Sequence, residues 1–103
     1  MIPLLRNVDI VGNQYRDAPA RAEFLRLEPG DMVVLKPTPS NPADPFAVEV
    51  WSDIHHIGFL PKQVSAVVHL TRMRPEIELW LEATVTEVLR DLPWHVRVTV
   101  TAE

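Results

Sequence analysis

One loop of this sequence combines a rigid backbone with polar side chains that are able to contact a ligand. It lies in the stretch "KPTPSNPADPFAVEVW", residues 36–51, where a strand pattern follows the loop directly. Four of the chain's ten prolines fall in it: Pro37, Pro39, Pro42 and Pro45. Because proline locks its φ angle, this loop has little conformational entropy left to lose on binding. A plain connector needs no such rigidity, so the loop is the first candidate for a binding site.

The other residues with reactive side chains do not favour catalysis or metal binding. The chain has no cysteine, and Ser40, Ser52 and Ser65 lie outside any nucleophile-elbow context. His55 and His56 are neighbours on a predicted strand, so their rings point to opposite faces and no third ligand follows at zinc spacing. The carboxylates are spread over the expected strands. We expect no enzymatic activity, no bound metal and no cofactor. A small hydrolase or nuclease is the least favoured hypothesis.

The distribution of charge is more informative than its sum. A net charge of −4 argues against indiscriminate binding of nucleic acid by the whole surface. Between Asp53 and Glu76, however, there is no acidic residue, and Lys62, Arg72, Arg74 and three of the four histidines lie in that window. The window predicts a basic face on an acidic protein. A chance gap on a solvated face is the alternative.

Apolar periodicity predicts many short strands and little helix. We expect strands over residues 8–12, 32–37, 46–51, 55–60, 78–89 and 94–102, and helices over 18–27 and 61–70. The first helix is expected to bury Ala22, Phe24 and Leu25. The alternation in the strand over 78–89 slips near Val88, which predicts a bulge. Gly58, inside a strand, predicts the close approach of another backbone or of a ligand.

These elements predict a small, mainly β fold rather than a series of βαβ units. We expect an OB-like or SH3-like antiparallel barrel, partly open, of five or six strands with one or two short helices. Its length favours a single domain over residues 1–103. No apolar run is long enough for a bilayer and no signal-peptide pattern is present, so we expect no membrane association and a cytoplasmic location.

Three motifs in order resemble the HIRAN domain, in a stand-alone or fragment form like those of bacteria and phages. They are "DIVGNQY" (9–15), "SNPADPFAVEV" (40–50) and "HIGFLPKQVSA" (56–66), and "EATVTEV" and "WHVRVTV" stand where the family's last two strands belong. The resemblance implies an OB-like barrel without catalytic activity, which recognises the free 3′ end of single-stranded DNA as an accessory module of DNA-remodelling, nuclease or helicase proteins.

The resemblance assigns the proline-rich loop to the DNA pocket. Asn41 and Asp44 match the family's residues, whereas Ala43 and Phe46 replace an aromatic residue and an asparagine. Asp44, held between two prolines, is expected to accept a hydrogen bond from the 3′-hydroxyl. Turn formation is the alternative role of Asn41 and Asp44, and core packing is that of Phe46.

The rest of the assigned pocket comes from two other motifs. Gln14 and Tyr15 stand where the family has an arginine and a tyrosine, so the aromatic platform is kept and the guanidinium is not. Phe59 replaces a polar residue after Gly58, and Lys62 is kept for a phosphate. A half-buried rim position for Tyr15, core packing for Phe59 and a solvated Lys62 are the alternatives.

The resulting hypothesis is a non-enzymatic module that binds the 3′ end of single-stranded DNA. Its partners would be DNA and a nuclease or helicase protein, in DNA repair or remodelling. A protein-interaction module on the same barrel, without 3′-end recognition, is the alternative, supported by the net charge of −4 and by Trp80, which stands opposite its strand's apolar face.

Overall fold

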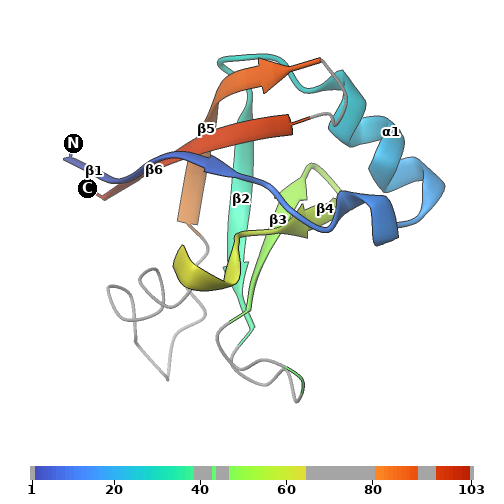
Figure 1. Ribbon diagram of the computed structural model, residues 1–103, viewed down its shortest axis with the longest axis horizontal. Helices are drawn as coiled ribbons and strands as arrows, with labels where there is room; N and C mark the ends of the chain where they lie inside the picture. Colours follow the sequence, from blue (N-terminus) through green and yellow to red (C-terminus); the bar gives the residue numbers. More distant parts are fainter. Residues whose placement is uncertain (1, 39–42, 44–46, 65–80, 91–94, 103) are drawn as a thin grey trace.

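A single antiparallel sheet dominates the protein. The structure, a computed structural model, describes residues 2–38, 43, 47–64, 81–90 and 95–102. Within these residues six strands form one sheet in the order β1-β6-β5-β2-β3-β4 (Figure 1). The strands are β1 (Ile2–Asp9), β2 (Met32–Pro37), β3 (Val48–Ser52), β4 (His55–Phe59), β5 (Leu81–Leu89) and β6 (His95–Ala102). The predicted mainly β, partly open barrel is confirmed.

The sheet curls until its two edges meet just after β1. The backbone N–H of Ile10 donates to the carbonyl of Val96 at 2.9 Å, which extends the β1–β6 pairing. The next residue, Val11, exchanges two 2.8 Å backbone hydrogen bonds with Phe59 on β4, the opposite edge. Gly58 makes this contact possible, because a Cβ there would lie 2.6 Å from the Val11 carbonyl oxygen. The predicted close approach at Gly58 is thus confirmed, and the approaching group is backbone.

The core follows the alternation of the strands. Side chains of one face of β3, β5 and β6 are buried, as the sequence pattern predicts, and they pack against residues of β1, β2, β4 and the helix. The predicted bulge of β5 is present as a register shift between Val85 and Glu87. β1 begins six residues before the predicted strand, because its register shifts twice along β6 and so shows no clean alternation. The buried cluster comprises Val8, Ile10, Phe24, Leu27, Val33, Leu35, Val48, Val50, Ile57, Leu60, Ala83, Val85, Val96, Val98 and Val100.

Two short helices, η1 (Asn13–Tyr15) and α1 (Ala18–Arg26), connect β1 to β2. The side chain of Asp17 caps α1 by accepting a 3.0 Å hydrogen bond from the Ala20 N–H. The predicted buried face is wrong in part, because α1 buries Ala20 and Phe24, whereas Ala22 is exposed and Leu25 is 50% exposed. Residues 62–64 are helical, Pro61 stands directly before them, and residues 65–70 of the predicted second helix lie outside the described residues. No helix in the described ranges is long and apolar enough to cross a membrane.

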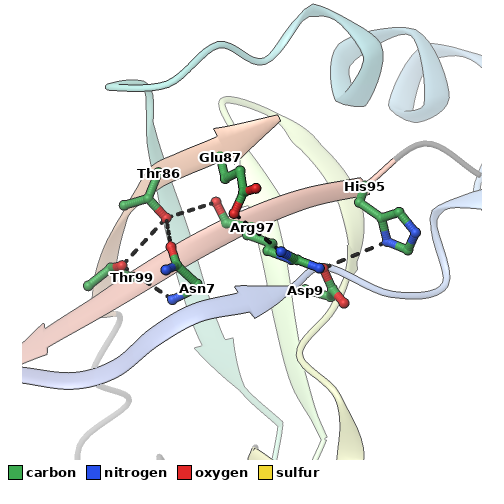
Figure 2. Close-up of polar contacts among 7 residues, drawn as sticks. All are labelled: Asn7, Asp9, Thr86, Glu87, His95, Arg97 and Thr99. Carbon is green, nitrogen blue, oxygen red and sulfur yellow. Dashed lines mark hydrogen bonds and ion pairs between the residues drawn. The ribbon is translucent and has the colours of Figure 1, made fainter. Parts of the chain in front are cut away.

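A polar network on the outer face ties β1 to β6 and β5 (Figure 2). Arg97 of β6 donates from Nε to Asp9 Oδ1 at 2.9 Å and from a terminal nitrogen to Glu87 Oε2 at 3.2 Å. Thr86, at the bulge of β5, donates to Asn7 Oδ1 at 2.8 Å. Exposed ion pairs of this kind add little to stability, so their main effect is on geometry. They hold the end of β1, from which Val11 and η1 follow.

Candidate functional site

The predicted aromatic platform, Tyr15, stands on a short and well-defined turn. Gly12 has φ of +80°, a left-handed conformation that turns the chain out of the strand and into η1. The Tyr15 N–H then donates to the Gly12 carbonyl at 3.1 Å. The Tyr15 side chain is 84% exposed, and Gln14 beside it is also exposed. An aromatic ring held this far into solvent by an ordered turn is available for stacking.

Two side chains on either side of Tyr15 anchor this turn on β4. The Asn13 amide nitrogen donates to the Ile57 carbonyl at 2.8 Å, and Arg16 Nε donates to the His56 carbonyl at 3.0 Å. Since β4 is an edge strand, these two bonds attach the turn to the free edge of the sheet. The backbone of Tyr15 is therefore held from both sides while its ring extends into solvent.

Phe59 of β4 lies against the start of the turn that carries Tyr15. Its ring lies against Gly12, where a Cβ would be 3.5 Å from Phe59 Cδ2. The ring is half-buried and packs edge-on against His56, with centroids 4.8 Å apart. His56 in turn stacks on Trp51 of β3, with centroids 5.3 Å apart and an interplanar angle of 13°. Phe59, His56 and Trp51 thus form a continuous row of rings, which we call the ring row.

The imidazole of the ring row behaves as a neutral aromatic group. Burial, and next the positive charge of Arg16, lower the pKa of His56 from 6.5, although Glu49 and the hydrogen bond to Gly58 act in the opposite direction. Nε2 lies 2.9 Å from the Gly58 carbonyl oxygen, which only accepts, so Nε2 carries the proton. At neutral pH the ring therefore offers a stacking surface rather than a positive charge.

The base of the proline-rich loop lies near the end of β4. The N–H and the hydroxyl of Thr38 both donate to the Ala47 carbonyl at 3.0 Å and so close the loop. Next to this closure the Leu60 N–H donates to the Val48 carbonyl at 3.0 Å. Lys62 follows two residues later and is exposed. The predicted site residues Asn41, Asp44 and Phe46 lie outside the described residues.

The described part of the predicted site is distributed around β4. Figure 1 shows η1 beside α1 on one side of β4 and the helical turn of residues 62–64 on its other side. Phe59 lies between them, joined to the η1 segment by the Val11 pairing and to Lys62 by the chain. The structure thus brings Tyr15 and Phe59 onto adjoining segments and sets Lys62 beyond them.

Sequence reasoning missed three residues of this surface. Arg16 supplies a guanidinium one position after Tyr15. It lies close to position 14, where this chain has glutamine and the family has an arginine, and its adjacency to Tyr15 was the available signal. Within the described residues its terminal nitrogens make no hydrogen bond, since only Nε is used by His56. His56 and Trp51 pair across β3 and β4, a relationship that depends on strand register.

The histidine pair shows the predicted geometry. His55 is paired with the buried Ser52, and His56 with Trp51 on the opposite face of β3. The two imidazoles therefore belong to opposite sides of the sheet. Within the described residues, no three histidine and acidic side chains gather closely enough to hold a metal ion.

Comparison with known proteins agrees with this architecture. The family model of the HIRAN domain matches residues 5–103. A crystal structure of a protein from Lactobacillus plantarum, determined as a structural-genomics target, is similar with a TM-score of 0.71 at 22% identity, and the match covers 96% of this chain and 93% of that one. At that identity the similarity supports the fold alone. No curated protein matches the sequence significantly.

Proposed function

Because the chain belongs to the HIRAN domain family, we propose that it is a non-enzymatic module that binds single-stranded DNA at a free 3′ end. One observation carries the proposal. The exposed Tyr15 stands on a turn that two side chains anchor on β4, the strand of Phe59, and the cationic Arg16 and Lys62 follow these two aromatic residues in the chain. This combination of rings and cations is typical of surfaces that bind single strands.

The chemistry of each group fits one part of a strand terminus. Tyr15 stacks on a base, a contact worth about 1–3 kcal/mol. Arg16 and Lys62 contact phosphates, because guanidinium and ammonium groups donate to phosphate oxygens. Asp44, on the proline-rich loop, accepts a hydrogen bond from the 3′-hydroxyl. The closure of that loop at Thr38 and Ala47 supports this role, since it anchors the loop next to the end of β4.

The proposed binding is weak and depends little on overall charge. The net charge of −4 gives the protein no long-range attraction to DNA. Affinity therefore has to come from the few local contacts. Such a module suits an accessory role, in which a nuclease or helicase partner supplies catalysis in DNA repair or remodelling. We place this activity in the cytoplasm and assign it to a single domain over residues 1–103.

The test compares DNA strands that differ only in their ends. A fluorescent linear oligonucleotide of thymidines is displaced by unlabelled competitors: the same linear strand, its circularised form without ends, and a blunt duplex. We expect the linear strand to compete at least tenfold better than the circle. If the linear and the circular strand compete equally, the protein does not recognise a strand end. If no DNA competes, the protein-interaction module is favoured.

A further inference from the structure

We propose that the ring row, Phe59, His56 and Trp51, is a second stacking subsite, which binds the bases that precede the 3′ terminus. The inference deepens the proposed function and depends on it. A terminus alone needs one base platform, and Tyr15 is the platform assigned to it. The ring row begins next to Gly12, three residues from Tyr15, and continues over β4 to β3.

The placement of the row favours a ligand rather than the core. Trp51 and His56 are paired residues on the face of β3 and β4 opposite to the buried Val48 and Val50. All three rings are half-buried, and none belongs to the buried hydrophobic cluster. Side chains on the outer face of a curled sheet meet solvent or a partner, and a continuous row of rings there matches the π-faces of successive bases.

The ring N–H groups of the row already donate within the protein. Trp51 Nε1 donates to Glu49 Oε1 at 2.8 Å, and His56 Nε2 donates to the Gly58 carbonyl at 2.9 Å. These bonds orient both rings and leave no ring N–H to read the edge of a base. The contacts that remain are stacking contacts, which every base can make. The subsite therefore recognises a single strand without sequence preference.

Charge beside the row favours one side for the backbone. The Arg16 side chain is held on the His56 carbonyl on the η1 side of β4, whereas Glu49 lies on β3, where it pairs with Phe59 and accepts from Trp51. Phosphates are attracted to the Arg16 side and repelled by the Glu49 carboxylate. The strand is thus expected to place its sugar–phosphate backbone along η1 and its bases over the rings.

A series of strands with abasic sites tests the subsite on the 103-residue chain. Thymidine strands with a free 3′-hydroxyl carry a single abasic site at the terminal, second, third or eighth nucleotide, and their affinities are measured by fluorescence anisotropy. For the wild type we expect losses of about tenfold at the terminal nucleotide and at one or both of the next two, and almost none at the eighth.

Matched variants assign the inner effect to the ring row. His56→Gln keeps a donor for the Gly58 carbonyl but removes the ring, so the abasic penalty at the inner position should vanish while the terminal penalty stays. His56→Phe restores a ring and should restore the inner penalty. Trp51→Leu and Trp51→Phe form a second pair, and thermal melting checks that each variant is folded.

The outcomes separate this inference from the proposed function. An inner penalty that is present in the wild type and unchanged in His56→Gln and Trp51→Leu would overturn the second subsite. Sensitivity at the terminal nucleotide alone would also overturn it, while leaving 3′-end binding intact. Equal binding of linear and circular strands would instead contradict the proposed function.

Discussion

Val11 and Phe59 exchange two backbone hydrogen bonds of 2.8 Å, which join the end of the first strand to the opposite edge of the sheet. This pair closes the barrel and also assembles the candidate site. On the Val11 side the chain continues through Gly12 into the turn that carries Tyr15. On the Phe59 side it continues to Lys62. The same contact therefore determines both the stability of the curl and the spacing of the proposed binding groups.

Gly58→Ala should destabilise the fold by about 1–3 kcal/mol, as overpacking of a well-packed site commonly does. The added Cβ would lie 2.6 Å from the Val11 carbonyl oxygen and 2.8 Å from Ile10 Cγ2. Urea denaturation measures the loss, with His55→Ala on the same strand as the control. A free energy of unfolding within about 0.5 kcal/mol of wild type would show that the edges separate at little cost.

Strands such as β3 and β6 were predictable from sequence because each has one buried face. Val96, Val98 and Val100 alternate cleanly and are all buried, and the phase slip in β5 is a real bulge. The face of α1 was not predictable in the same way. Its sequence offers two apolar stripes, and the one that packs on β4 is set by tertiary contacts.

The candidate site was predictable only where a local motif carried it. Tyr15 lies three residues after Gly12 and Phe59 lies directly after Gly58, both within the quoted motifs, so the resemblance located them. The roles of Asn13 and Arg16 depend on carbonyls of β4 that are 44 and 40 residues away in sequence. Such long-range pairing is decided by how the sheet curls, which no local pattern encodes.

Tyr15→Ala should weaken the binding of a 3′-hydroxyl strand by roughly 1–3 kcal/mol through loss of a stacked base. Stability should not change, because the ring is 84% exposed. Tyr15→Phe is the matched control, since it keeps the ring and should bind like wild type. Anisotropy titrations together with melting curves measure both quantities. An alanine variant that binds as tightly as wild type would remove Tyr15 from the site.

Lys62→Gln should reduce the salt dependence of DNA binding. Each phosphate contact on a single strand contributes about −0.7 to the log–log slope, so we expect a wild-type slope on the order of −1 to −2 that becomes shallower by about 0.7. Arg26→Gln, an exposed cation at the end of α1, is the control and should leave the slope unchanged. Identical slopes for Lys62→Gln and wild type would mean that Lys62 contacts no phosphate.

His56 should make the fold less stable at mildly acidic pH. Burial, followed by the charge of Arg16, lowers its pKa from 6.5, so the unfolded chain takes up a proton that the folded protein resists. Stability from this group is therefore complete above pH 6.5 and falls as the pH drops below that value. Urea midpoints of the wild type and of His56→Gln are measured at several pH values. The carboxylates titrate in the same way in both proteins, so a difference between the two pH profiles is due to His56. Parallel pH profiles would exclude this contribution.

The most direct test of the central claim is the response of Asp44 to the chemistry of the 3′ end. Affinities are measured for 3′-hydroxyl and 3′-phosphate strands with wild type and with Asp44→Asn, which keeps the turn-forming shape but removes the charge. We predict that the wild type prefers the hydroxyl end and that Asp44→Asn binds it about 1–2 kcal/mol more weakly. The variant should also partly recover binding of the phosphate end. If both proteins bind both strands equally, recognition of the 3′ end is contradicted.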